Sequence, residues 1–138
     1  MTKFPLEIVT PDRVFFSDKV DMVIVRGIEG DLAVLNNRTP LVTPLAIGKA
    51  KVVIDGNERY CALSNGYLKV SKEKTTIISD SAEWPEEIDV KRAEKAKERA
   101  EKRLKKRTDG LDVARAEIAL KRAINRLQVS ELKSVRNK

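Results

Sequence analysis

Residues 86–104 read EEIDVKRAEKAKERAEKRL, and this stretch divides the chain into two parts of different character. Its apolar residues recur at steps of three and four, which is the spacing of one helical face. These residues are Ala93, Ala96, Ala100 and Leu104. Asp89 is suited to cap such a helix, and Glu86 and Glu87 stand where the positive end of the helix dipole favours acidic groups. The stretch therefore predicts a charged surface helix.

A second helix is expected after it. The sequence TDG at residues 108–110 predicts a turn, and Asp112 is an N-cap candidate for a helix that begins at about that residue. The apolar residues of this helix recur every seven positions, with alanines between them. They are Val113, Leu120 and Leu127, with Ala116 and Ala123. Two helices joined by a short turn form an antiparallel hairpin. An alanine seam buries little surface, at about 0.8 kcal/mol per CH₂, so we expect the hairpin to be held weakly and to have two arrangements.

Residues 1–85 show a different period. Short runs rich in Val, Ile and Leu, such as FPLEIV and KVDMVIV, are separated by turn signals. Asp55-Gly56 and Asn65-Gly66 are expected to form hairpin turns, because these residue types tolerate positive φ. Trp84-Pro85 then interrupts the pattern. The fold class predicted is α+β: an antiparallel β-sandwich or flattened barrel over residues 1–85, followed by a two-helix hairpin over residues 86–138.

The formal charge of +7 lies entirely in the second part. Residues 1–85 hold 11 basic and 11 acidic side chains, whereas residues 86–138 hold 17 basic and 10 acidic ones. One interpretation of the basic tail is a nucleic-acid-binding module, since positive charge attracts phosphate backbones. Against it, the tail has no aromatic residue for base stacking, and its basic residues alternate with acidic ones. Solvated helix faces with ion pairs are the second interpretation.

Several kinds of chemistry are excluded. The chain has no histidine, which removes the histidine-dependent catalytic triads and most metal sites, and it has no glycine-rich phosphate loop. We therefore expect no enzyme activity, no catalytic residue and no bound metal. Cys61 is the single cysteine and is expected to be a buried apolar residue. No apolar run has the length of a signal peptide or a membrane span, so a cytoplasmic protein is expected.

Four arginines have informative spacing. Arg92 and Arg99 lie seven residues apart on one stripe of the first helix, and Arg122 and Arg126 lie one turn apart on the second. Spacing alone favours solvated faces. The alternative is that arginines from two folded-back helices converge on a polyphosphate, because forked guanidinium donors suit phosphate oxygens.

Taken together, the motifs resemble one family over nearly the whole chain. In the first part they are IVTPDRVFFSD, EGDLAVL, TPLVTPLAIG and SNGYLKV, and in the second EEIDVKRAEKAKERAEKRL and RAEIALKRAINRLQV. In this order they are similar to the epsilon subunit of bacterial F-type ATP synthase. One difference is the loop at residues 36–38, which reads NNR where the family often has Pro-Gly-His.

The resemblance implies a non-catalytic rotor subunit of the central stalk, peripheral to the cytoplasmic face of the plasma membrane. Its partners would be the gamma subunit and the ring of c subunits. It would help to couple ion translocation to ATP synthesis. The hairpin would inhibit ATP hydrolysis when it extends toward the catalytic beta and alpha subunits.

The resemblance also implies a regulatory ATP ligand for the folded hairpin, with no other cofactor required. Some family members bind ATP through the motif Ile/Leu-Asp-x-x-Arg-Ala, which IDVKRA at residues 88–93 matches. The residues carried over are Glu83, Ile88, Asp89, Arg92, Ala93, Arg99, Arg122 and Arg126. The alternative role of Asp89 is helix capping alone.

Overall fold

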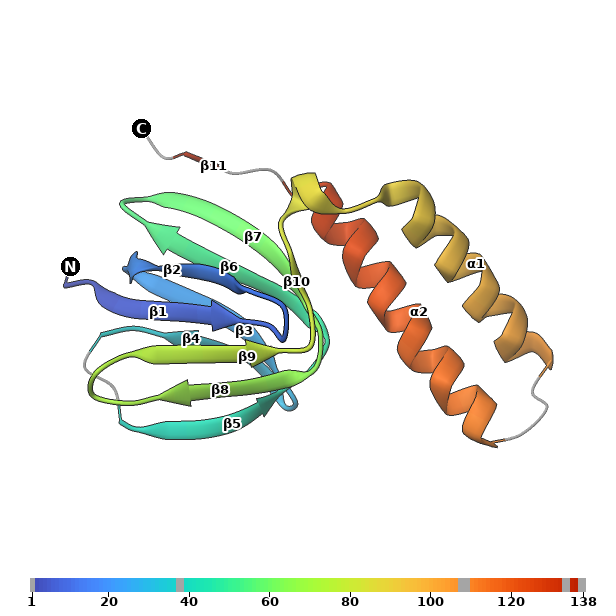
Figure 1. Ribbon diagram of the computed structural model, residues 1–138, viewed down its shortest axis with the longest axis horizontal. Helices are drawn as coiled ribbons and strands as arrows, with labels where there is room; N and C mark the ends of the chain where they lie inside the picture. The colour runs from blue at the N-terminus through green and yellow to red at the C-terminus, as the bar shows by residue number, and fades with distance from the viewer. Residues whose placement is uncertain (1, 37–38, 107–109, 133–134, 137–138) are drawn as a thin grey trace.

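The computed structural model describes residues 2–36, 39–106, 110–132 and 135–136. It consists of a β-sandwich with two antiparallel helices at one end (Figure 1). The sandwich strands are β1 (Phe4–Val9), β2 (Val14–Val20), β3 (Met22–Gly27), β4 (Gly30–Val34), β5 (Leu41–Leu45), β6 (Gly48–Ile54), β7 (Asn57–Leu63), β8 (Gly66–Val70), β9 (Thr75–Ser79) and β10 (Ala82–Glu83). A 3₁₀ turn (Pro85–Glu87), α1 (Val90–Lys106), α2 (Gly110–Ser130) and a two-residue strand, β11 (Val135–Arg136), follow.

The strands form one continuous sheet that folds back on itself. Their order is β10-β7-β6-β3-β5-β8-β9-β1-β2, with β4 beside β3 and β11 beside β7. The sheet turns its corner between β3 and β5, which are joined by the pair Gly27 and Leu45. Every pairing along the sheet is antiparallel except that of β1 with β9. The predicted sandwich followed by a helical hairpin is confirmed, with this one parallel pair as a difference.

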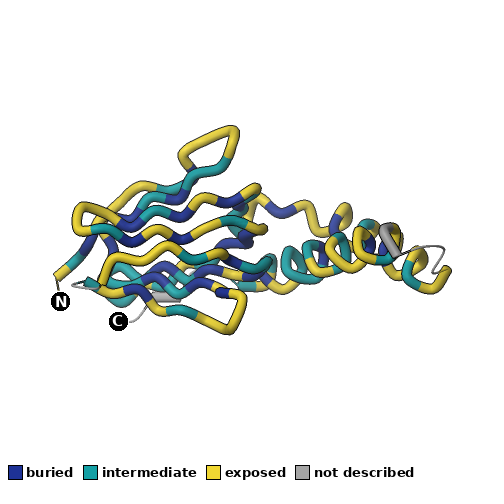
Figure 2. Tube along the Cα trace, turned by 90° about the horizontal axis from the view of Figure 1, so that it is seen from below, coloured by how far each residue is buried: buried dark blue, intermediate teal, exposed yellow. Residues whose placement is uncertain are grey.

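Alternating burial explains why these runs form strands. Figure 2 shows buried and exposed residues following one another along the sandwich. The inward residues form one apolar core that includes Leu6, Ile8, Leu68 and Ile77, each 1% exposed or less. Side chains of a strand point alternately to its two faces, so these residues share the inner face. Cys61 belongs to this core, as predicted, and burial raises the pKa of its thiol to about 12.

The two expected hairpin turns have different outcomes. Asp55-Gly56 joins β6 to β7 with positive φ at both residues, 50° and 79°, as predicted. The prediction for Asn65-Gly66 is wrong, because β8 pairs with β5 and β9 and not with β7. Gly66 instead begins β8, and a Cβ there would lie 1.8 Å from the carbonyl oxygen of Ile78. That glycine permits the close approach of β9 rather than a turn.

The hairpin follows the predicted pattern with one correction. Asp89 caps α1, since its Oδ1 accepts a hydrogen bond of 3.1 Å from the backbone N–H of Arg92. The second helix begins at Gly110, not at about Asp112, which lies in its first turn. Residues 108–109 of the expected turn and residues 37–38 of the NNR loop lie outside the described residues.

Alanines form the seam between the two helices. Ala93 and Ala100 of α1 and Ala116 and Ala123 of α2 are all 4% exposed or less. Small side chains allow the two helices to pack closely while burying little apolar surface. Among the described residues, no helix has both the length and the apolar composition needed to cross a membrane.

We predict that Leu68→Ala lowers the free energy of unfolding by about 3 kcal/mol, because it leaves a cavity in the sandwich core. Urea denaturation followed by the fluorescence of Trp84, the single tryptophan, would measure the change. The same substitution at Leu41, which is 44% exposed, serves as the control and should cost about 1 kcal/mol or less. Equal losses for the two variants would contradict the assignment of the core.

Candidate functional site

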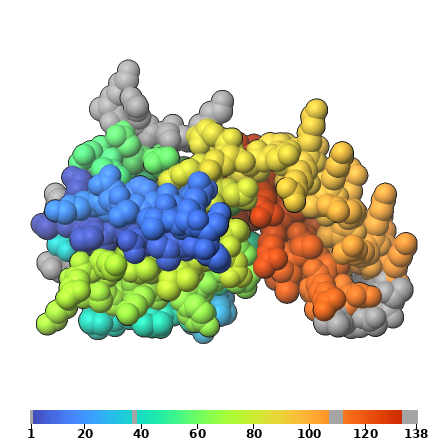
Figure 3. Space-filling view, viewed as in Figure 1, coloured from blue at the N-terminus to red at the C-terminus, as the bar shows by residue number. Residues whose placement is uncertain are grey.

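The junction between the hairpin and the sandwich is the candidate site. Figure 1 shows α2 between the sandwich and α1, and Figure 3 shows α2 against one end of the strands, with α1 on its far side. Helix α2 contacts β6, β7 and the 3₁₀ turn, whereas α1 packs on α2. The position of the whole hairpin therefore depends on the contacts that α2 makes.

Asn125 lies at the centre of this junction. Its Nδ2 group donates hydrogen bonds to the backbone carbonyls of Gly48, at 3.0 Å, and Leu63, at 3.3 Å. Gly48 and Leu63 are opposite each other at the end of the β6–β7 ladder. One helix side chain thus donates to two carbonyl groups at the end of the sheet, and each such hydrogen bond contributes about 0.5–1.5 kcal/mol.

Two arginines on the next stripe of α2 make further polar contacts. The Nε of Arg126 forms an ion pair of 2.6 Å with Oε1 of Glu83. The Nε of Arg122 donates a hydrogen bond of 3.1 Å to the hydroxyl of Ser64. Both side chains of the ion pair are about one third exposed, at 35% and 29%, so solvent screens it and it contributes about 1 kcal/mol or less.

A small apolar cluster completes the junction. Val129 of α2 is fully buried against Ala62 of β7 and Ile88, which precedes α1. Fully burying one such side chain stabilises a contact by about 1.5–3 kcal/mol. A cluster of three residues and a few hydrogen bonds is a small attachment for two helices. This size agrees with the expectation of a weakly held hairpin, which remains a prediction.

The linker between the two parts is fixed to the sandwich. The ring of Trp84 stacks on Phe15 at a centroid distance of 4.4 Å, and the guanidinium of Arg59 lies 3.7 Å from its centroid on the ring face. Arg13 forms an ion pair of 2.9 Å with Glu87, whose Oε1 also accepts a hydrogen bond of 2.9 Å from the N–H of Trp84. The contacts that fix the linker to the sandwich therefore end at Glu87, immediately before Ile88.

The residues predicted to contact ATP fall into two groups. Glu83, Arg122 and Arg126 come together and line a narrow depression, and Arg126 and Glu83 also line a neighbouring depression of about 510 Å³. Arg92 and Arg99 instead line a shallow depression of about 380 Å³ along α1. Ile88 is in the apolar cluster, Asp89 caps α1, and Ala93 lies in the helix seam. The four arginines line no common depression.

The sequence interpretation missed two residues at this junction, Asn125 and Ser64. A signal for the first was present, since asparagine is a poor helix former and here stands between two arginines of a helix. Ser64 gave no such signal. In the described ranges, no group of three or more His, Cys, Asp or Glu side chains is arranged to hold a metal ion.

Comparison with known proteins shows the family. Residues 3–85 match the family described as ATP synthase, Delta/Epsilon chain, beta-sandwich domain, and residues 86–131 match its long alpha-helix domain. The chain belongs to the ATP synthase delta/epsilon family. The two matches follow one another in the order in which the structure places the sandwich and the hairpin.

Relatives within this family match almost end to end. The chain is 47% identical over 131 residues to an ATP synthase epsilon chain of Caldicellulosiruptor bescii. This alignment covers 95% of this chain and 96% of the relative. It is 50% identical over 132 residues to the ATP synthase epsilon chain of Alkaliphilus metalliredigens, and the alignment covers 96% of this chain and 98% of the relative. A chain in the solved Euglena gracilis mitochondrial ATP synthase (OSCP/F1/c-ring) aligns with a TM-score of 0.77 and 26% identity, over 88% of this chain and 77% of that one.

We predict that Asn125→Leu loosens the hairpin without unfolding the sandwich. The change removes the two hydrogen bonds to the carbonyls of Gly48 and Leu63, which together contribute about 1–3 kcal/mol, while leucine is the better helix former. Hydrogen exchange of the α2 backbone amides should become at least about tenfold faster, and the exchange rates of the β8 and β9 amides should not change. Glu117→Leu, at an exposed position of the same helix away from the junction, should leave both unchanged. Faster exchange across the sandwich, or none in α2, would contradict this role.

Proposed function

We propose that the chain is a non-catalytic central-stalk subunit of an F-type ATP synthase. The observation that carries the proposal is the nearly end-to-end similarity to ATP synthase epsilon chains, with the sandwich and the hairpin both matched. The sandwich would bind the gamma subunit and the ring of c subunits, peripheral to the cytoplasmic face of the membrane. The +7 charge is then assigned to contacts with other subunits rather than to nucleic acid.

The hairpin is proposed to inhibit ATP hydrolysis by leaving the sandwich. Its attachment is small, and the anchored linker allows everything after about Ile88 to move while the sandwich stays in place. Once extended, its basic side chains would contact the catalytic beta and alpha subunits. A modest ligand can choose between two arrangements of similar free energy.

ATP is the proposed regulatory ligand of the docked hairpin. Arg122 and Arg126 would supply forked donors for phosphate oxygens, which suits a polyphosphate. Glu83 already lies within 2.6 Å of Arg126, so a bound triphosphate would compete for that guanidinium. Arg92 and Arg99 are exposed on α1 and would contact the ligand from that helix, as would the neighbouring Asp89 and Ala93. No metal or further cofactor is proposed.

We predict opposite effects for removing the hairpin and for undocking it. In a reconstituted ATP synthase, deletion of residues 88–138 should preserve assembly and raise ATP hydrolysis, because the inhibitory element is gone. Asn125→Leu should instead lower hydrolysis, because it increases the extended population. Steady-state hydrolysis rates would be measured at equal amounts of assembled complex. A deletion that leaves the rate unchanged would count against inhibition, and loss of assembly on both changes would assign the hairpin a purely structural role.

We predict that ATP binds the isolated chain and that Arg126→Gln weakens it by about tenfold, the effect of losing one charged hydrogen bond. Isothermal titration calorimetry would measure the dissociation constant. Arg115→Gln, an exposed arginine on the same helix, is the charge-matched control and should leave affinity unchanged. Binding that is equally weakened by both variants would indicate general charge attraction, and absence of binding at millimolar ATP would remove nucleotide sensing while leaving the rotor role intact.

A further inference from the structure

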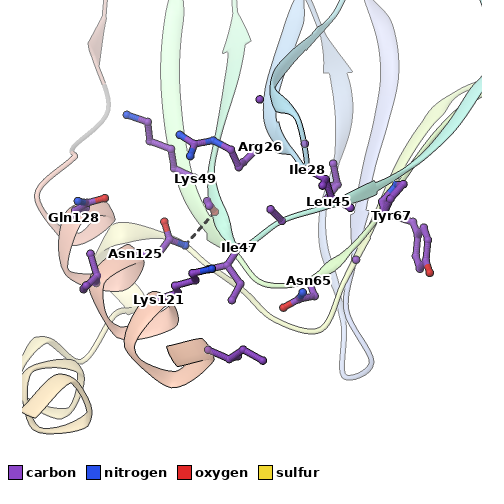
Figure 4. A pocket seen from close by; sticks show the side chains of 18 residues that line it. Arg26, Ile28, Leu45, Ile47, Lys49, Asn65, Tyr67, Lys121, Asn125 and Gln128 are labelled. Atoms are coloured by element: carbon purple, nitrogen blue, oxygen red, sulfur yellow. Dashed lines mark hydrogen bonds between the residues drawn. The ribbon is translucent and has the colours of Figure 1, made fainter. Parts of the chain in front are cut away.

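A groove of about 820 Å³ lies between the sandwich and the flank of α2 that carries Lys121 and Gln128 (Figure 4). On the sandwich side it is lined by residues 26–28, 30, 44–49 and 65–67, at the ends of strands and in the loops between them. On the helix side it is lined by residues of α2 between Ile118 and Gln128. Because the lining comes from both parts, the groove is complete only while the hairpin is docked.

The charge of the lining has one sign. It contains three cationic side chains, Arg26, Lys49 and Lys121, and no acidic one. Arg26 is paired with Asp31 at 2.6 Å. In the described part of the chain, neither Lys49 nor Lys121 forms an ion pair. Two lysines, one from each side, thus line the groove without a carboxylate partner, with the Nζ of Lys49 5.8 Å from the centroid of the Tyr60 ring, and such a lining attracts anions.

The groove also exposes apolar side chains. Ile28, Tyr67 and Ile118 are 68%, 56% and 44% exposed, and Leu45 lies buried at its base. Exposed apolar side chains that gather around a concavity are typical of a binding site rather than of ordinary surface. The volume is within the range of small-molecule sites, about 300–1,000 Å³. An apolar wall with lysines at its edge selects a ligand that is both apolar and negatively charged.

We propose that this groove binds a small organic anion with an apolar chain, its head group held by Lys49 and Lys121 and its chain against the isoleucines. The head group is a carboxylate or a phosphate, since a lysine ammonium binds either as a point charge. None of the residues expected to contact ATP lines this groove, so the site is separate from the proposed nucleotide site.

Binding has a consequence for the hairpin. A ligand that touches α2 and the sandwich at once binds only the docked arrangement. At ten times its dissociation constant it shifts the docking equilibrium about elevenfold toward the docked hairpin. This inference does not rest on the rotor role, because it concerns the isolated chain.

The experiment is an NMR titration of the full chain with four ligands that share an eight-carbon chain, each kept below its critical micelle concentration. Octanoate and octyl phosphate are the anionic probes, octyl glucoside is neutral and octylammonium is cationic. The anionic probes should produce saturable shifts of the amides of Ile28, Ile47, Ile118 and Ile124, and octylammonium should not. Saturation by only one anionic probe identifies the head group as carboxylate or phosphate, and either result supports the site.

Variants test the lysines directly. The double variant Lys49→Gln/Lys121→Gln should weaken binding of the anionic probes by about tenfold, because the loss of each exposed charge weakens binding by about threefold. The matched control is Lys95→Gln/Lys102→Gln, which removes two lysines from the α1 depression and should leave binding unchanged. Equal weakening by both double variants, or shifts that octylammonium reproduces, would overturn the proposal. Shifts that follow protein concentration without a probe would assign the groove to a second copy of the chain and would also overturn it.

Discussion

The pairing of Asn125 with two backbone carbonyls is the contact on which the arrangement of the molecule depends. It joins a helix to the carbonyls of Gly48 and Leu63, where the β6–β7 ladder ends. Because α1 packs on α2, the contacts of α2 at Asn125, together with those of Arg122, Arg126 and Val129, hold both helices against the sandwich. The alanine seam lies on the other side of α2 and buries little apolar surface between the two helices, so the hairpin itself is also lightly packed.

Local patterns predicted the parts of the fold that local forces determine. The strands of the sandwich, the Asp55-Gly56 turn and the Asp89 cap each depend on residues within a few positions of one another. Asn65-Gly66 has the composition of a turn, but the tertiary requirement at Gly66 is close contact with the backbone of Ile78, which no local pattern contains. For the same reason the site was only partly predictable: the family resemblance gave Glu83 and Arg126, whereas Asn125 acquires its role from strands more than 60 residues away.

The linker shows how the movement proposed for the hairpin would leave the sandwich in place. Trp84 is held between Phe15 and the Arg59 guanidinium, and Glu87 is held by Arg13. These contacts end immediately before Ile88, which belongs to the docked cluster instead. Movement of the hairpin therefore breaks the contacts of Val129 and Asn125 but none of those that fix the linker. Substitutions in the sandwich core and at the junction should then change the stability of the sandwich and the docking equilibrium separately, because free-energy effects at distant sites usually add.

The two flanks of α2 present different kinds of positive charge to a ligand. On one flank, Arg122 and Arg126 already have acceptors in Ser64 and Glu83, so an anion there must replace existing contacts. The replaced ion pair is screened and worth about 1 kcal/mol or less, so only a ligand with several charges gains clearly by the exchange. On the other flank, Lys49 and Lys121 have no ion pair among the described residues, and a single charge suffices there if an apolar chain contributes the remaining affinity. Two ligands of different chemistry could thus bind the docked hairpin together, each increasing the affinity of the other, because both select the same arrangement.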